Sequence, residues 1–448
     1  MDRPIYMTKQ QKKTYRGFLY VVLAAAVIAL VTVIYFAYWD KIPSTIKIRA
    51  GVEQELDFRI PVSGEIYRIR ETAAQVSSIP TSESDTEQEQ AKESISDSVQ
   101  SIHVDFTHTV KVRANELDTY QINLKLFGVL PYKSVDIEVI QDKMLIPSGI
   151  PIGIYVKTNG VLVVGIGEFE NEQGKKVSPA KYVLQKGDYI LKADGVEIEN
   201  KKQFVRLIED SAEENMVLTI KRNNEITDVM VEPEYNQNKE RKLGIWIRDN
   251  AQGIGTMTYE DTDHTFGALG HGINDVDTST LMNLEEGTLY KTEIVGITRG
   301  TNGSPGELTG YIEYDSDNII GEITENTAEG IFGVCDDEIA QAAYEPIPIA
   351  LKQEIELGPA QIICSVTGEP EFYDVEIVEV NLEQDNVNRG IVIQVVDEKL
   401  LTLTGGIIQG MSGSPIIQNG KLAGAVTHVL VQDSTRGYGI FIEEMLGH

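Results

Sequence analysis

The chain has 448 residues, with 39 basic and 69 acidic side chains, which gives a formal net charge of −30. This length predicts two or three domains, and a composition with 42% hydrophobic and 24% charged residues is typical of a globular protein. The acidic excess argues against a nucleic-acid partner, because phosphate binding needs clustered Lys and Arg. Two cysteines, Cys335 and Cys364, are too few for a Cys-rich zinc site or a disulfide scaffold. They could form one bridge outside the cytoplasm, but two small buried thiols are the favoured interpretation. The sequence contains no metal or nucleotide motif, so we expect no cofactor.

The first predicted element is a membrane-spanning helix. Residues 17–39 contain no charged side chain, and a helix of this length spans roughly 34 Å, enough for a hydrocarbon core of about 30 Å. Basic side chains dominate residues 1–16, so positive-inside logic leaves this segment in the cytoplasm and exports the rest of the chain. A cleaved signal peptide is the alternative, although the apolar run is long for one and no small-residue cleavage site clearly follows it. We therefore expect a single-pass protein with a retained anchor.

Residues 40–143 alternate between apolar and polar side chains in two blocks, as in the run from Ile122 to Leu126. Period-two alternation predicts half-buried strands, and hence a small β module. Between the blocks, residues 77–98 are rich in acidic and poor in apolar side chains. Such a stretch cannot bury enough surface to become ordered, so we expect a solvated, disordered loop.

Residues 144–235 combine a tight Asp194-Gly195 turn, a helix that begins after Asn200, and two strands over 216–220 and 225–231. Together with the run Lys186-Gly187-Asp188-Tyr189-Ile190-Leu191, this pattern resembles a PDZ domain of the kind attached to bacterial proteases. By that resemblance Pro151, Ile152, Gly153 and Ile154 occupy the place of the carboxylate-binding loop. In that family, backbone N–H groups of the loop receive a peptide terminus while the peptide adds a strand to the sheet edge. An α+β domain without a ligand is the alternative.

Residues 240–448 contain recurring strand-like runs and almost no helical periodicity, which predicts one all-β barrel-type domain. Near its end lies the run Gly410-Met411-Ser412-Gly413-Ser414-Pro415. A serine becomes a nucleophile only with a base to take its proton and donors to stabilise the oxyanion. The flanking glycines would let the N–H groups of Gly410 and Ser412 point at one spot and form that oxyanion hole. Ser414 is the rival nucleophile, and it is disfavoured because it directly precedes Pro415.

The favoured histidine for the general base is His271. It lies at the end of a short apolar strand, between Gly270 and Gly272. A histidine at the end of a strand, between two glycines, is expected to have an exposed ring. Because a nucleophile-type serine lies in the same domain, we favour His271 as the general base. His428 lies on a strand that would flank the primary specificity pocket of a chymotrypsin-like barrel. It would line that pocket or serve in packing, and both interpretations stay open.

The third member of such a site is a carboxylate that orients the imidazole. The sequence offers Asp275, Asp277, Asp374 and Asp397. Asp397 follows the strand-like run 391–396, and with it the chain order His, Asp, Ser matches that of chymotrypsin-like enzymes.

The whole layout resembles one family, the SpoIVB-type serine peptidases (stage IV sporulation protein B) of endospore-forming bacteria. The resemblance rests on the single N-terminal span, the PDZ-like segment and four motifs: 267–271, 405–415, 424–429 and 437–439. It implies a mainly β protein with a transmembrane helix, a small β module, a PDZ-like α+β domain and a chymotrypsin-like double β-barrel. It also implies a catalytic triad of His271, Asp397 and Ser412.

The same resemblance implies a function and a location. The protein would be a membrane-anchored serine endopeptidase that is made in the forespore and exported into the space between the two forespore membranes. There it would cut the regulator of an intramembrane protease and so release a mother-cell sigma factor. The PDZ-like domain would bind target or self peptides and restrain the enzyme, and self-cleavage near the N-terminus would release the active form.

Two other classes of protein compete with this interpretation. One is a non-catalytic, PDZ-containing envelope scaffold, which would have no use for both the serine motif and the histidine motif. The other is a stress protease with a downstream PDZ domain, in which the peptidase comes first in the chain. The order of the segments here argues against it.

Overall fold

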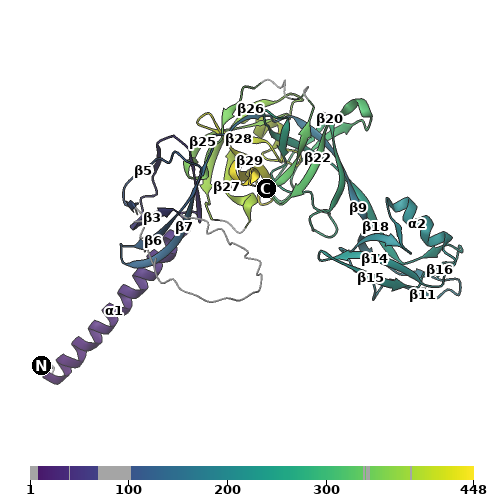
Figure 1. Ribbon diagram of the computed structural model, residues 1–448, viewed down its shortest axis with the longest axis horizontal. Coiled ribbons are helices and arrows are strands. Elements are labelled where there is room, and N and C mark those ends of the chain that lie inside the picture. The colour runs from purple at the N-terminus through teal and green to yellow at the C-terminus, as the bar shows by residue number, and fades with distance from the viewer. Residues whose placement is uncertain are drawn as a thin grey trace, which may run out of the picture. The chain divides into compact units, whose positions relative to one another are not determined.

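The computed structural model describes residues 9–39, 41–68, 102–336, 339, 344–383 and 386–447 (Figure 1). The chain divides into two units, Met1–Asp142 with Asn381–Glu383 and Lys143–Val380 with Gln384–His448. The acidic segment 77–98 lies outside the described residues.

The first unit begins with a single long helix, α1 (Lys9–Trp39). Its stretch Lys12–Trp39 is long and apolar enough to cross a membrane, a property that membrane anchors and signal sequences share. The helix starts before the apolar run, because the basic residues ahead of Gly17 continue the same helical turns. At its other end, the rings of Tyr35 and Trp39 pack against Tyr132, with ring centroids 5.3 and 5.5 Å away.

The rest of the first unit is the small β module that alternation predicts. Its five-stranded sheet has the order β1-β7-β6-β3-β4, with β1 and β7 parallel, and a separate pair joins β2 and β5. The strands are β1 (Thr45–Arg49), β2 (Gln54–Leu56), β3 (Val62–Arg68), β4 (Ile102–Asp105), β5 (Val110–Val112), β6 (Thr119–Leu126) and β7 (Leu130–Ile140). In β6, alternate residues Ile122, Leu124 and Leu126 are buried, so one face of the sheet forms the core.

The second unit contains a barrel that six strands close. Successive antiparallel pairings join β9 to β20, β20 to β22, β22 to β23, β23 to β19 and β19 to β18, and β18 pairs back with β9. The strands are β9 (Pro151–Ile166), β18 (Ile245–Glu260), β19 (Thr265–Ala268), β20 (Leu284–Thr298), β22 (Ile319–Thr327) and β23 (Gly330–Cys335). Attached to this first barrel are β8 (Met144–Pro147), β21 (Glu307–Ile312), β24 (Ile347–Pro348) and the 3-10 turn η1 (Ser316–Asn318).

A second closed barrel follows in the chain, with the strand order β25-β26-β27-β30-β29-β28. Its strands are β25 (Gly358–Cys364), β26 (Glu371–Val380), β27 (Ile391–Val395), β28 (Pro415–Gln418), β29 (Lys421–Leu430) and β30 (Asp433–Phe441). Its helices and 3-10 turns are η2 (Lys352–Glu354), η3 (Val387–Arg389), α4 (Glu398–Thr404) and α5 (Ile442–Met445). Two barrels of this kind confirm the mainly β, chymotrypsin-like fold class.

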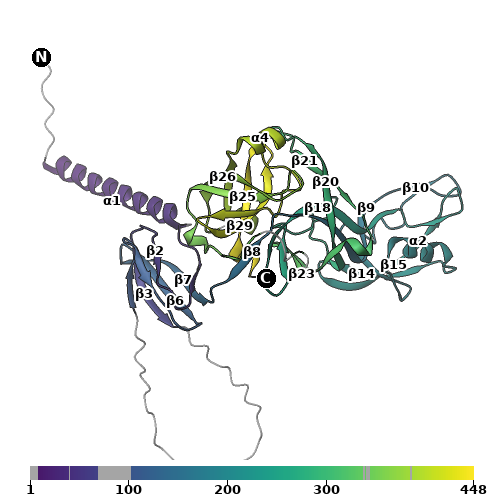
Figure 2. The same ribbon diagram turned by 90° about the horizontal axis from the view of Figure 1, so that it is seen from above.

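The PDZ-like part lies between two strands of the first barrel. Both β9 and β18 are 16 residues long, and their far halves leave the barrel and join the sheet that holds β12 and β14 (Figures 1 and 2). The elements of this part are β10 (Phe169–Glu170), β11 (Lys176–Val177), β12 (Tyr189–Ala193), β13 (Val196–Glu197), α2 (Lys201–Asp210), β14 (Met216–Arg222), β15 (Glu225–Val231), β16 (Glu234–Tyr235) and β17 (Arg241–Lys242). Two continuous strands therefore connect the PDZ-like part to the barrel.

Local predictions for the PDZ-like part agree with the structure. Asn200 caps α2 by accepting a hydrogen bond from the Gln203 amide at 2.9 Å, and Phe204 and Ile208 are buried on its inner face. The strands β14 and β15 cover the predicted ranges 216–220 and 225–231.

The predicted peptide-binding loop is wrong. Pro151, Ile152, Gly153 and Ile154 form the start of β9, which pairs with β18 on one side and with β20 on the other. Ile152 and Ile154 pack in the core of the first barrel with Met257, Phe266 and Leu289. A strand with both edges paired has no free N–H groups for a peptide terminus, so this segment belongs to the barrel rather than to a PDZ-like domain over 144–235.

Both cysteines are free and buried, as the favoured interpretation predicts. Burial raises the pKa of both the Cys335 and the Cys364 thiols to about 12. Neither thiol is therefore a reactive thiolate at neutral pH.

Candidate active site

Ser412 lies on the loop between α4 and β28, and the first barrel holds this loop in place. Thr256 of β18 donates two hydrogen bonds to it, from its amide to the Ser412 carbonyl and from its hydroxyl to the Gly410 carbonyl, both at 2.9 Å. Two residues further along β18, the buried Thr258 hydroxyl donates to the Gly413 carbonyl at 2.8 Å. Gly413 has φ +98°, and a Cβ there would lie 1.9 Å from the Thr256 carbonyl oxygen. Glycine is required at 413 because β18 passes directly against the loop.

The backbone N–H groups of Gly410 and Ser412 have no hydrogen-bond acceptor among the described residues. Within the part of the chain that the structure describes, neither N–H donates a hydrogen bond, whereas the neighbouring Met411, Gly413 and Ser414 amides all do. Two unpaired amides that flank a partly exposed serine hydroxyl are the donors that an oxyanion needs. Ser414, by contrast, is fully buried, so it cannot meet a substrate, and its hydroxyl has no hydrogen-bond partner among the described residues.

His271 lies on a turn with an unusual backbone. After β19, Leu269 and Gly270 both take the left-handed conformation, with φ +68° and +66°, before the chain reaches the histidine. For a leucine this conformation costs roughly 1–2 kcal/mol, so surrounding contacts must hold it. The Leu269 amide donates to the Thr256 carbonyl at 3.2 Å, and Asn388 of η3 donates to the Gly270 carbonyl at 2.7 Å.

The hydrogen bond of the His271 ring defines its tautomer, that is, which ring nitrogen carries the proton. Nδ1 lies 2.9 Å from the Gly272 carbonyl oxygen, which can only accept, so Nδ1 carries the proton. In the neutral ring the lone pair is then on Nε2, the nitrogen that acts as a general base in serine peptidases. Burial lowers the pKa of His271, while the Gly272 carbonyl opposes this shift. The ring is therefore neutral, and able to accept a proton, at neutral pH.

Ser412 and His271 line one cavity of about 510 Å³, together with His428. Within the described chain the two side chains do not bond to each other, because the Ser412 hydroxyl donates to the Thr427 carbonyl at 2.6 Å. The His271 and His428 rings lie 4.7 Å apart, and partial burial, His271 and Arg389 lower the pKa of His428 to about 4. Apart from the two histidines, no described residue that lines the cavity carries a titratable side chain.

The candidate acids lie elsewhere. Asp397 is the N-cap of α4 and accepts a hydrogen bond from the Leu400 amide at 2.9 Å, and it is not among the residues that line the cavity. Asp374 accepts from the Gln361 side chain on the barrel surface at 2.9 Å. Asp275 and Asp277 both pair with Arg248 of β18. The structure thus brings the predicted serine and histidine together, but it does not bring any of the four acids to the His271 ring.

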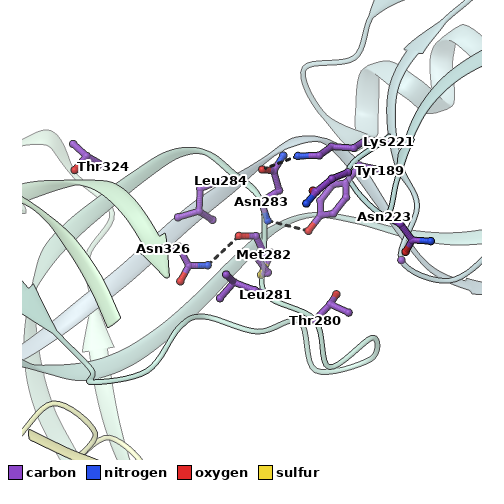
Figure 3. Close-up of a pocket in the computed structure, with 12 residues that line it drawn as sticks. Tyr189, Lys221, Asn223, Thr280, Leu281, Met282, Asn283, Leu284, Thr324 and Asn326 are labelled. Atoms are coloured by element: carbon purple, nitrogen blue, oxygen red, sulfur yellow. Dashed lines mark hydrogen bonds between the residues drawn. The ribbon is translucent and has the colours of Figure 1, made fainter. Parts of the chain in front are cut away.

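The segment that follows His271 also contacts the PDZ-like part. Between them lies a cavity of about 620 Å³, and Figure 3 shows the residues that line it. The Asn283 amide donates to the Tyr189 hydroxyl at 3.0 Å, and Lys221 donates to the Asn283 side-chain oxygen at 3.4 Å. On the barrel side, Asn326 donates to the Met282 carbonyl at 3.0 Å and bonds both backbone groups of Ile273. The histidine-bearing segment, residues 271–283, is therefore bonded to both the PDZ-like part and the first barrel.

A separate groove lies within the PDZ-like part. It has a volume of about 460 Å³ and runs between α2 and the chain segment 243–247. Along Ile245–Ile247, one edge of β18 pairs with β9, and no described strand pairs with the other edge. Gly244 (φ +73°) turns the chain into this strand, and Asp249 anchors the start of α2 by accepting from the Lys201 amide at 2.8 Å. This is the open strand edge beside a helix that β-strand addition requires.

Sequence reasoning missed three residues that shape the active site: Thr256, Thr258 and Asn388. The side chain of each donates its hydrogen bonds to the opposite barrel. No motif marks them, because a threonine within a strand and an asparagine in a polar turn are common. Only the pairing of distant segments reveals their contacts.

Residues 239–446 match the model of the SpoIVB peptidase S55 family. This C-terminal segment is a serine peptidase domain of that family. The match confirms the resemblance to the SpoIVB-type peptidases over the region that contains His271 and Ser412. A search of curated proteins finds no match for the chain.

Solved structures give more distant likenesses. The chain is similar to the PDZ domain of the SdrC-like protein from Listeria monocytogenes, with 19% identity over 20% of this chain and 87% of that chain, at a TM-score of 0.17. It is also similar to the Rv3671c protease from Mycobacterium tuberculosis. For the active form the identity is 15% over 44% of this chain and 72% of that chain, at a TM-score of 0.24. For the inactive form it is 15% over 43% and 81%, at a TM-score of 0.25.

Proposed function

We propose that this S55 peptidase is an endopeptidase in which Ser412 is the nucleophile and His271 the general base. One observation carries the proposal: both side chains line the same cavity, beside two unused amides. Nε2 of His271 takes the Ser412 proton as Oγ attacks the scissile carbonyl carbon. The amides of Gly410 and Ser412 stabilise the resulting oxyanion, and the imidazolium then protonates the leaving amine. Water, activated by His271, hydrolyses the acyl-enzyme and restores both groups.

Before the attack, the serine side chain has to change its hydrogen bond. Its hydroxyl now donates to the Thr427 carbonyl, and rotation about its χ1 angle would redirect the proton toward the histidine. His271 is already in the tautomer that this step needs. The family resemblance alone proposes Asp397 as the third member of the triad. In this structure its carboxylate caps α4, so the mechanism above does not use it.

Labelling with a fluorophosphonate tests the nucleophile. We expect modification of Ser412 in the wild type and none after Ser412→Ala, which should also lower peptide hydrolysis by several powers of ten. Ser414→Ala is the matched control, because that neighbouring hydroxyl is buried, and its labelling should stay at the wild-type level. Peptide hydrolysis that persists in Ser412→Ala would overturn the assignment.

The substrate is a protein or a peptide, and we propose that the residue before the cut is uncharged. The cavity beside Ser412 offers aliphatic side chains, among them Ile254, Val429 and Val431. Among the described residues that line it there is no carboxylate, lysine or arginine that would pair with a charge. His428 would contribute to this preference from the rim of the cavity. A peptide library should return uncharged residues at this position, and a preference for Lys, Arg, Asp or Glu would contradict the proposal.

We also propose that the PDZ-like part binds an extended peptide in the groove between α2 and the open edge of Ile245–Ile247. Strand addition would pair the backbone of the peptide with β18, and the groove would hold its side chains. Val205 on the exposed side of α2 lines this groove. Val205→Arg should weaken binding of a target peptide without lowering the hydrolysis of a short chromogenic substrate. Equal loss of both activities would argue against a separate peptide site.

By family resemblance we propose that the protein acts in sporulation as a membrane-anchored enzyme. It would cut the regulator of an intramembrane protease in the forespore intermembrane space, with the PDZ-like part restraining cleavage and self-cleavage. The bonds of Tyr189 and Lys221 to Asn283 support such a restraint, because they join the PDZ-like part to the histidine-bearing segment. In an endospore-forming host, Ser412→Ala should block release of the mother-cell sigma factor. Normal release in that strain would exclude this role.

A further inference from the structure

Asn388 bonds to both sides of the active site. It lies in η3, just before β27 of the second barrel, and its side-chain amide donates two hydrogen bonds to the first barrel. One goes to the Gly270 carbonyl at 2.7 Å and the other to the Ala328 carbonyl at 2.8 Å. The side-chain NH2 group of Asn388 thus donates to two separate turns of the opposite barrel.

The first of these bonds acts on the residue directly before His271. Leu269 and Gly270 hold a left-handed backbone that a leucine adopts at a cost, so this turn relies on bonds from outside. The Asn388 amide supplies such a bond at the peptide unit that joins Gly270 to the histidine. It therefore limits where the imidazole can lie.

On the serine side, Asn388 uses its backbone. Its carbonyl accepts a hydrogen bond from the Thr427 hydroxyl at 2.7 Å, and the Thr427 carbonyl in turn accepts from Ser412 at 2.6 Å. One residue is therefore bonded, through a single intermediate on each side, to the nucleophile and to the base.

We propose that Asn388 is a positioning residue that sets the distance between Ser412 and His271 by joining the two barrels at the site. The inference rests on the proposed roles of those two residues. Asn388 is not among the described residues that line the cavity, so its loss should change the relative position of Ser412 and His271 rather than substrate binding. A displacement of about 1 Å between nucleophile and base can lower a rate by about 10²-fold. We therefore expect loss of the Asn388 amide to lower kcat by about 10- to 100-fold with little change in KM.

Two substitutions separate this role from packing. Asn388→Ala removes the side chain, whereas Asn388→Asp keeps its size but presents only acceptor oxygens to the two carbonyl groups when ionised. If the donated bonds matter, both variants should lose kcat, although Asp fills the same space. Asn386→Ala is the matched control. Asn386 caps the same turn by accepting from the Asn388 amide at 3.1 Å, and it is not among the described residues that line the cavity of Ser412 and His271.

The experiment measures kcat, KM, fluorophosphonate labelling rate and thermal unfolding for the full chain and each variant. We expect Asn388→Ala and Asn388→Asp to lose kcat and labelling rate together at unchanged KM, with Asn386→Ala within about twofold of the wild type. Wild-type kcat in Asn388→Asp, or an equal loss in Asn386→Ala, would overturn the proposal.

Thr427→Val provides a second test of the positioning role. If Asn388→Ala does not fold at the assay temperature, Thr427→Val removes the bond on the serine side while keeping the side-chain shape, and it should lower kcat about fivefold, as expected for one hydrogen bond. Unchanged kcat in Thr427→Val and Asn388→Asp would then refute the positioning role. A wild-type chain that is not labelled at Ser412 would instead refute the proposed function on which the inference rests.

Discussion

The serine loop and the histidine turn are held in different ways, although they form one site. Three hydrogen bonds from Thr256 and Thr258 of the first barrel fix the serine loop, which belongs to the second barrel. The histidine turn belongs to the first barrel, and a side chain of the second barrel, Asn388, donates to it. Each of the two proposed catalytic groups is therefore held by hydrogen bonds from the opposite barrel, and we expect the site to be sensitive to how the two barrels pack.

The histidine turn depends on fewer hydrogen bonds than the serine loop does. The serine loop has several bonds and a glycine that lets β18 approach closely. The histidine turn contains a leucine in the left-handed region, and bonds from Thr256 and Asn388 hold it. We therefore expect substitutions around the histidine to affect the rate, and those under the serine loop to affect stability as well.

The largest effect should come from the base itself. His271→Ala should lower kcat/KM for peptide hydrolysis by several powers of ten, because the imidazole proposed to accept the Ser412 proton is then missing. Steady-state kinetics and the fluorophosphonate labelling rate test this prediction. His264→Gln, at the other end of β19, is the control and should stay within about twofold of the wild type. A His271→Ala enzyme with more than a tenth of the wild-type rate would contradict the role of the base.

The pH dependence of kcat/KM gives the next effect. Burial lowers the pKa of His271, so the neutral base persists to a lower pH than for an exposed histidine with a pKa of about 6.5. As the pH falls through the pKa of His271, the ring becomes protonated and the rate should drop about tenfold per pH unit. We expect the midpoint of this acid limb below 6.5. A midpoint at or above 6.5 would show that the ring is not desolvated in the working enzyme.

Thr258→Val tests the bracing of the serine loop. The substitution keeps the shape of a fully buried side chain but leaves the Gly413 carbonyl without its donor. An unsatisfied buried acceptor costs about 1–3 kcal/mol, so the free energy of unfolding in urea should fall by that amount. Thr298→Val, on the exposed end of β20, should change it by less than about 0.5 kcal/mol. Equal stability of Thr258→Val and the wild type would mean that β18 does not brace this loop.

Asp397→Asn should have the smallest effect. Asparagine caps a helix as well as aspartate does, so α4 should keep its N-terminal bond to the Leu400 amide. On the geometry of this structure we expect kcat within about threefold of the wild type. A loss of about 10⁴ in kcat would instead show that the carboxylate reaches His271 during catalysis, as the family resemblance implies.

Local signals in the sequence were sufficient for much of the fold. The Asn200 cap predicted the start of α2, and period-two alternation predicted the strands of the first unit. These features depend on neighbours within a few residues, which the sequence lists directly. The serine and histidine motifs were identifiable for the same reason, since each places its glycines beside the reactive side chain.

The errors come from contacts between distant segments. Residues Pro151–Ile154 have the composition of a loop followed by a strand, but pairing with β18 and β20 makes them part of one long barrel strand. The same long-range pairing placed the open strand edge at Ile245–Ile247 instead. Asp397 stays a prediction: chain order favoured it, and in this structure its side chain caps α4. Asn388 carried no local signal at all, because its role depends on a carbonyl more than a hundred residues away.

The most direct test of the central claim is a crystal structure of the fluorophosphonate adduct of the full chain. We predict phosphorus bonded to Ser412 Oγ, a phosphoryl oxygen within hydrogen-bond distance of the Gly410 and Ser412 amides, and His271 Nε2 facing the adduct. We also predict that Asn388 still donates to Gly270 in that state. An adduct on another serine, or His271 turned away from a modified Ser412, would contradict the pairing of these two groups across the barrels.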